Sequence, residues 1–187
     1  MPELVRRATV EGGSGTLTAS KLPSELQKYI GRISGFVEGP DEVNKAMIRH
    51  WCEMVEDANP LYTDEKYAKN SEYRGIVSPP TMQSTWVYPR WWPPVAMPPD
   101  VGPAQLDLPL ENVPIPAVIS LTEEYFLPMR PGDRIHYMTK LDNISPLKKT
   151  RVGAGYFITT TNYYYNQRDE LVGTSQYVLF RYRIINK

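Results

Sequence analysis

The clearest periodic pattern in the sequence lies between residues 43 and 55, where apolar side chains recur at steps of three and four. That spacing places them on one face of an α-helix. The predicted apolar face consists of Val43, Ala46, Met47, His50, Trp51, Met54 and Val55. Asp41 or a neighbour can cap the start of the helix. Pro60 has no N–H and restricts Asn59, so we expect the helix to end by this point.

The pattern changes from residue 117 onward, where β-branched and aromatic residues partly alternate with polar ones. Such runs, separated by Gly-, Pro- and Asn-containing turns, are typical of β-strands. Strands are predicted over 30–37, 117–126, 133–141, 152–165 and 171–185. One helix followed by antiparallel strands in series predicts an α+β fold, a curled antiparallel sheet wrapped around a long central helix.

Residues 87–116 separate these two parts and hold nine of the eighteen prolines, together with Trp91 and Trp92. Proline at this density prevents helices and central strands. A long irregular segment inside a domain is either a functional lid or a surface loop without a role, and both interpretations remain open. We therefore expect a flexible N-terminal tail over residues 1–23, then a single domain over 24–187 that contains the insertion at 87–116.

Charge and composition narrow the function classes. The 187 residues include 21 basic and 21 acidic side chains, and no basic block points to nucleic acid or an anionic membrane surface. No apolar run approaches the roughly 20 residues of a membrane span, and the N-terminus lacks the apolar stretch of a secretory signal. The single Cys52 allows no internal disulfide and fits a cytoplasmic location.

The polar residues after the predicted helix are the main candidates for chemistry. Asp57 could act as a general base if burial raised its pKa. Tyr62, with an ordinary pKa near ~10, is a passable acid but a poor base at neutral pH. The alternative for Asp57 is structural, as a side chain that hydrogen-bonds the backbone around Asn59.

The two histidines have weaker claims to a catalytic role. His50 falls on the predicted apolar helix face, which favours a core or interface position, and His136 lies within a predicted strand without an obvious acidic partner. Neither has the neighbours of a metal site, and no Gly-rich phosphate loop or dinucleotide fingerprint is present. We therefore expect no metal and no cofactor.

Four motifs occur in an order that is informative as a set. They are Asp57-x-Asn59-Pro60-Leu61-Tyr62-x-Asp64, Tyr73-x-Gly75-Ile76-Val77-x-Pro79-Pro80-Thr81, Glu124-Tyr125-Phe126-x-Pro128-x-Arg130-Pro131-Gly132-Asp133 and Tyr164-x-Asn166-Gln167-x-x-Glu170-Leu171-Val172. Over residues 30–182 the chain resembles the MaoC-like acyl-thioester dehydratases and hydratases of hotdog fold. The likeness is closest to the first-half, N-terminal dehydratase domain subgroup.

This resemblance implies a function as well as a fold. Such domains pair as fused halves, homodimers or heterodimers, and they bind acyl-CoA or acyl-carrier-protein thioesters between the halves. The implied reaction is reversible addition of water to a 2-enoyl thioester, usually giving the (R)-3-hydroxyacyl product. On this basis Asp57 and Tyr62 are the candidate catalytic residues, and Asn59, Ser78 and Thr81 are candidate substrate-binding residues.

The sequence departs from the family pattern at two positions. Catalytic members carry Asp-x-x-Asn-Pro-x-His, and Tyr62 stands where that histidine is expected. The family's Ala-His-Gly segment, which offers a backbone N–H to the thioester carbonyl, reads Ser78-Pro79-Pro80 here, and proline has no N–H. The resemblance thus implies a chain that shapes the acyl pocket while a second hotdog chain supplies the Asp/His pair. Two alternatives remain open: a self-sufficient homodimeric hydratase using Asp57 with Tyr62, and a non-catalytic binding or scaffold protein.

The tryptophans around the insertion suggest what the pocket holds. Trp86, Trp91 and Trp92, near flexible methionines, would suit a bulky apolar acyl group such as a long-chain, aromatic or steroid-like substituent. A partner interface or ordinary packing explains the same residues equally well.

Overall fold

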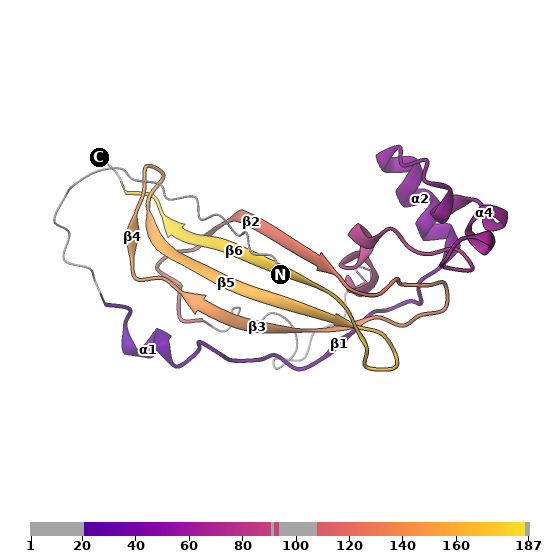
Figure 1. Cartoon of the computed structure of the whole chain (residues 1–187). Coiled ribbons are helices and arrows are strands. Elements are labelled where there is room, and N and C mark those ends of the chain that lie inside the picture. The colour runs from indigo at the N-terminus through magenta and orange to yellow at the C-terminus, as the bar shows by residue number, and fades with distance from the viewer. Residues whose placement is uncertain (1–20, 91, 94–107, 186–187) are drawn as a thin grey trace, which may run out of the picture.

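The computed structural model describes residues 21–90, 92–93 and 108–185 (Figure 1). Most of the predicted tail and half of the insertion, including Trp91, lie outside these ranges. None of the helices in the described ranges is long and apolar enough to cross a membrane. The elements in chain order are α1 (Ser24–Gln27), β1 (Val37–Glu38), α2 (Lys45–Val55), α3 (Pro60–Thr63), α4 (Glu65–Asn70), the 3-10 turns η1 (Pro80–Met82) and η2 (Thr85–Val87), β2 (Ile115–Tyr125), β3 (His136–Ile144), β4 (Lys148–Lys149), β5 (Ala154–Tyr165) and β6 (Leu171–Arg183).

The strands form one six-stranded sheet in the order β1-β3-β5-β6-β2, and β4 pairs with β5 beside this path. Every strand pair is antiparallel. The α+β class and the four long strands agree with the sequence-based prediction. The edge strand β2 includes Pro116, which an edge tolerates because one side of the strand needs no backbone N–H donor.

The predicted strand over residues 30–37 is mostly irregular. β1 pairs with β3, but residues 31–34 are joined to β3 by an isolated bridge at Ile33 and a few backbone hydrogen bonds instead of a continuous ladder. Gly31 has a φ of 86°, a conformation that breaks an extended strand. The hydroxyl oxygen of Ser34 also accepts the backbone N–H of Thr139, so a side chain replaces part of the regular ladder.

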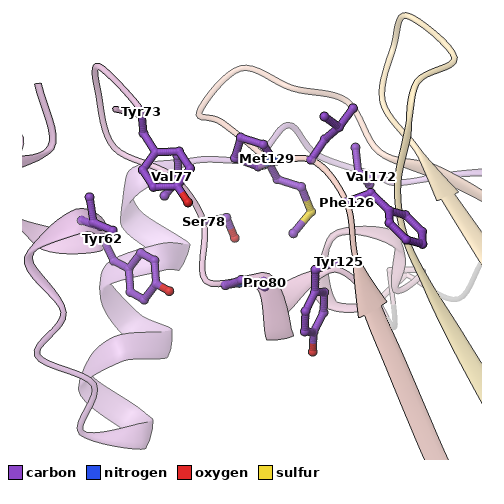
Figure 2. Close-up of a pocket in the computed structure, with 12 residues that line it drawn as sticks. Tyr62, Tyr73, Val77, Ser78, Pro80, Tyr125, Phe126, Met129 and Val172 are labelled. Carbon is purple, nitrogen blue, oxygen red and sulfur yellow. The ribbon is translucent and has the colours of Figure 1, made fainter. Parts of the chain in front are cut away.

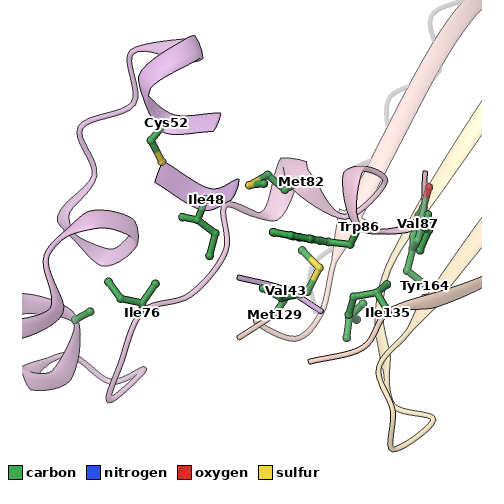
Figure 3. Close-up of a cluster of buried hydrophobic side chains, with 12 residues drawn as sticks. Val43, Ile48, Cys52, Ile76, Met82, Trp86, Val87, Met129, Ile135 and Tyr164 are labelled. Carbon is green, nitrogen blue, oxygen red and sulfur yellow. The ribbon is translucent and has the colours of Figure 1, made fainter. Parts of the chain in front are cut away.

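Two clusters of buried apolar side chains form the core. The first cluster joins the helical segments to one end of the sheet (Figure 3) and comprises Val43, Ile48, Cys52, Ala68, Ile76, Met82, Trp86, Val87, Met129, Ile135, Tyr164 and Val172. In the second cluster, Leu26 of α1 and the segment before β2 pack on β3 and β5. Its members are Leu26, Leu108, Leu110, Val113, Leu141, Ile144, Tyr156 and Ile158.

The position of α2 differs from the prediction. Figure 1 shows α2 beyond one end of the sheet instead of under its middle. Its buried residues are Ile48 and Cys52, one turn apart, whereas Met47, Met54 and Val55 are exposed. The predicted apolar face is therefore only partly confirmed, since Val43 is buried and Trp51 is half-buried, whereas the other predicted members are exposed. Ile48 and Cys52 belong to the first cluster and the partly buried Trp51 packs against it, whereas Met47, Met54 and Val55 on α2 stay exposed.

The ends of α2 are set by local hydrogen bonds. Asn44, not Asp41, caps the helix, since its side chain accepts the backbone N–H of Met47 at 2.9 Å. The helix ends at Val55, because Glu56 adopts a left-handed conformation with a φ of 56°. Pro60 then occupies the first turn of α3, a position that does not need its missing N–H.

The two faces of α2 allow a stability test. Ile48 is 0% exposed and Met54 is 69% exposed. Ile48→Ala should reduce the free energy of unfolding by roughly 2–5 kcal/mol, because it leaves a cavity in the first cluster. The matched control Met54→Ala should change it by no more than about 0.5 kcal/mol. Denaturant unfolding of the isolated chain measures both, and a larger loss from Met54→Ala would contradict this placement of α2.

Candidate functional site

An apolar pocket of about 180 Å³ lies between α3, the segment before η1 and the connection from β2 to β3 (Figure 2). Its walls are mostly apolar, and they carry three tyrosines and one serine. The lining residues are Leu61, Tyr62, Tyr73, Val77, Ser78, Pro80, Tyr125, Phe126, Leu127, Pro128, Met129 and Val172. A concave apolar site with a few polar groups is the usual form of a small-molecule pocket.

Backbone hydrogen bonds hold the walls of this pocket together. The N–H of Val77 donates to the carbonyl of Leu61 at 3.3 Å, and the N–H of Ser78 donates to the carbonyl of Met129 at 2.8 Å. The segment at Val77 and Ser78 is thus fixed between α3 and the β2–β3 connection. Asn59 starts α3 by accepting the N–H of Leu61 at 3.0 Å, which positions Tyr62 one residue later.

Tyr62 is half-buried in the pocket wall. Burial raises the pKa of its hydroxyl, the negative charge of Asp57 raises this pKa further, and Asn59 opposes the shift through a hydrogen bond. The phenol therefore stays protonated at neutral pH. It can donate a hydrogen bond or a proton, but it cannot take a proton from water as a histidine would.

Asp57 is held by the local backbone. Its Oδ1 accepts the N–H of Asn59 at 3.0 Å, which is the structural role that the sequence left open. Asp57 does not line the pocket, although it lies close enough to Tyr62 for its charge to affect the pKa of the phenol.

Ser78 is 3% exposed, and its polar groups are already occupied. Its Oγ donates to the carbonyl of Pro79 at 3.2 Å and accepts the indole N–H of Trp86 at 3.1 Å. Its backbone N–H is bound to Met129. Trp86 belongs to the first cluster and contacts Ser78 from behind instead of lining the pocket.

The other predicted substrate-binding residues lie elsewhere. Thr81 is exposed and does not line the pocket, and Trp92 is 84% exposed. Trp91 lies outside the described residues. The structure thus brings Tyr62 and Ser78 into one pocket, with Asn59 and Asp57 beside it, and it does not add Thr81 or Trp92 to this group.

Both histidines of the chain lie outside the pocket. His50 is exposed on α2 with its Nδ1 3.4 Å from a carboxylate oxygen of Glu53, so the predicted core or interface position within the chain is not seen. His136 on β3 stacks against Tyr165 and lies 3.4 Å from an oxygen of Asp169. No group of three or more metal-ligating side chains occurs in the ranges that the structure covers.

A polar network behind the pocket was missed by the sequence analysis. The hydroxyl of Tyr125 donates to Oε2 of Glu123 at 2.8 Å, while Oε1 of Glu123 accepts from Gln83 at 3.1 Å and from Ser175 at 2.9 Å. Burial, followed by this hydrogen bond, raises the pKa of Tyr125 to about 12. Tyr125 therefore adds a second protonated hydroxyl to the pocket.

Gln83 sits at the inner end of this network and is 1% exposed. Its Nε2 also donates to the carbonyl of Thr174 at 3.0 Å, whereas its Oε1 has no partner among the described residues. Gly173 makes room for it, because a Cβ there would lie 2.1 Å from that oxygen. The spacing of Glu123 and Tyr125 on one face of a strand could have indicated half of this network. Gln83 gave no local signal, since Thr174 is 91 residues away in sequence.

Comparison with known proteins agrees with the fold and the motifs. The family model for the FAS1-like dehydratase domain region matches residues 30–175. The chain is 36% identical over 171 residues to the probable enoyl-CoA hydratase alpha subunit of Thermomonospora curvata, covering 89% of this chain and 54% of that protein. It is 29% identical over 150 residues to the 3-oxo-4,17-pregnadiene-20-carboxyl-CoA hydratase alpha subunit of Mycobacterium tuberculosis, covering 72% of this chain and 45% of that protein. The chain thus spans about half the length of these curated relatives.

Solved structures show the same fold at lower sequence identity. A chain of the ChsH1-ChsH2 complex from M. tuberculosis superimposes with a TM-score of 0.75 at 22% identity, covering 87% of this chain and 92% of that one. The MaoC-like dehydratase from Rhodospirillum rubrum gives a TM-score of 0.56 at 21% identity, with coverages of 83% and 94%. The chain therefore belongs to the FAS1-like dehydratase-region family and has the hotdog fold of the MaoC-like dehydratases, as its four motifs predicted.

Proposed function

We propose that this chain is the acyl-binding subunit of an (R)-specific 2-enoyl thioester hydratase or dehydratase, and that a second hotdog chain supplies the Asp/His pair. The observation that carries the proposal is the absence of an imidazole from the pocket. The chain has two histidines, both are described, and neither lines the pocket that contains Tyr62.

The remaining polar groups of the pocket fit binding better than catalysis. Hydration needs a base for water and hydrogen-bond donors for the thioester oxygen, where negative charge develops. The Ser78 N–H is bound to Met129, and Pro80 at the pocket wall has no N–H. Tyr62 and Tyr125 are both held protonated by raised pKa values. The pocket thus provides apolar walls and protonated hydroxyls without a base of the required strength.

Exposed apolar side chains support the proposal that a second chain binds this one. Met47 and Met54 on α2 are 45% and 69% exposed, and Val118 and Ile119 on the edge strand β2 are 62% and 54% exposed. Exposed apolar surface of this extent is typical of a protein–protein interface. The relatives in T. curvata and M. tuberculosis are both named as alpha subunits, and one structural neighbour is a complex of two named chains.

The acyl group in this proposal is bulky and apolar. The pocket walls are formed mainly by aliphatic and aromatic side chains, and the M. tuberculosis relative is named for a pregnadiene carboxyl-CoA substrate. The thioester carrier is coenzyme A or an acyl carrier protein.

The division of labour can be tested by reconstitution. The purified chain should hydrate crotonyl-CoA or longer enoyl-CoAs only when it is mixed with a second hotdog chain that contains Asp-x-x-Asn-Pro-x-His. Asp57→Asn in this chain should leave the reconstituted rate within about twofold, because Asp57 is held by the Asn59 backbone. Full activity of the lone chain would contradict the proposal. Saturable thermal stabilisation by acyl-CoA without turnover in any pairing would identify a binding protein instead.

A second candidate is a self-sufficient homodimeric hydratase that uses Asp57 with Tyr62. It is favoured by the placement of Asp57 near the start of α3, where its negative charge adds to the effect of burial in raising the pKa of Tyr62. In that case Asp57→Asn and Tyr62→Phe should each lower kcat/KM of the lone chain at least about 100-fold while circular dichroism stays unchanged. Turnover equal to that of the unmodified chain in both variants would exclude this candidate.

A further inference from the structure

Two surface hollows beside α2 and α4 share walls and form one groove. They enclose about 240 Å³ and 310 Å³, and both are lined by Lys45, Glu65 and Ile76. The first hollow is also lined by Tyr62, which lines the apolar pocket as well. The second hollow extends to Arg130. The groove therefore runs from Tyr62, at the edge of the apolar pocket, to the loop after β2.

The groove concentrates positive charge on a chain that has no net charge. Its charged lining consists of five cations and one carboxylate, namely Lys45, Arg49, Lys69, Arg74, Arg130 and Glu65. The carboxylate is already paired, since Glu65 contacts the ammonium group of Lys45. Within the described ranges, the side chains of Arg49, Lys69 and Arg74 form no hydrogen bond or ion pair. Their charges are thus available to a ligand.

Local structure fixes the backbone positions of Lys69 and Arg74, and a hydrogen bond anchors the side chain of Arg130. Lys69 lies in the last turn of α4. Arg74 adopts a left-handed conformation with a φ of 56°, beside Gly75 in the groove wall. Arg130 donates from its guanidinium to the carbonyl of Tyr73, and its backbone N–H is bound by Asp133. A guanidinium anchored through one nitrogen keeps its other N–H groups free to bind an anion.

We propose that this cationic groove binds the phosphate groups of the arm that carries the acyl thioester. The inference rests on the proposed function for the identity of the ligand. An acyl group in the apolar pocket would place the thioester near Tyr62, and the arm would leave along the groove that begins at the same residue. Arginine and lysine are the side chains that bind phosphate most effectively, through charge and multiple N–H donors. The phosphates belong either to coenzyme A or to the phosphopantetheine of a carrier protein.

Direct binding of free ligands tests the groove without relying on turnover. Arg49→Gln and Lys69→Gln change exposed side chains and should not disturb the fold. Each should weaken binding of CoA roughly two- to fivefold at low salt, and the double variant should bind CoA more weakly than either single variant. Lys148→Gln is the matched control, because it removes one charge from β4 at the opposite end of the molecule (Figure 1) and should leave the affinity unchanged. Isothermal titration of the full chain, alone and with its partner chain, measures these affinities.

The ligand series identifies which phosphates are bound. Pantetheine has no phosphate, so its binding should not respond to the groove variants. Weaker binding of CoA alone assigns the groove to the CoA phosphates, and weaker binding of a holo but not an apo carrier protein assigns it to phosphopantetheine. An equal loss with the apo carrier protein would indicate an acidic protein surface and overturn the proposal.

Failure of this inference can be separated from failure of the proposed function. If the double variant binds CoA normally while reconstituted hydration persists, the groove proposal is wrong and the hydratase proposal stands. If CoA binding depends on the groove but no pairing gives hydration, the groove proposal stands and the hydratase proposal is wrong.

Discussion

The backbone hydrogen bonds of the segment at Val77 and Ser78 are the constraint on which the site depends. They tie α3 on one side to the β2–β3 connection on the other. Val77 and Ser78 face the apolar pocket, whereas Gly75 and Ile76, immediately before them, line the cationic groove. One short segment therefore positions a wall of each hollow. A change in its backbone path would alter both hollows together.

Tyr62 occupies the boundary between these two hollows, and its chemistry explains what the chain can and cannot contribute. A histidine at this position would titrate near neutral pH and could accept a proton from water. Burial and the charge of Asp57 instead raise the pKa of Tyr62 and keep the phenol protonated. One carboxylate oxygen of Asp57 accepts the N–H of Asn59. In the proposed enzyme, this side of the site orients the acyl group and donates hydrogen bonds, and the base comes from another polypeptide.

Local patterns in the sequence predicted the four long strands and the structural option for Asp57, because a period of two and an Asx turn depend on near neighbours. They did not predict which face of α2 is buried. That choice is made by Met82, Trp86 and the other members of the first cluster, which bury Ile48 and Cys52 completely and Trp51 in part. The network of Gln83 was missed for the same reason, since its partners lie 40 to 92 residues away in sequence. The sequence did not predict the cationic groove either, because its lysines and arginines come from separate segments and none of them stands out in its own segment.

The three faces of α2 connect these observations. Ile48 and Cys52 face the core, Lys45 and Arg49 line the groove, and Met47 and Met54 are exposed. Each pair is spaced by four or seven residues, so each forms its own stripe along the helix. Because only the stripe of Ile48 and Cys52 is fully buried, while charged and exposed apolar side chains occupy the other two stripes, the period of apolar residues alone did not identify the buried face. A second chain seated on the exposed stripe would lie next to the groove, where it could cover the carrier arm and bring a base close to Tyr62.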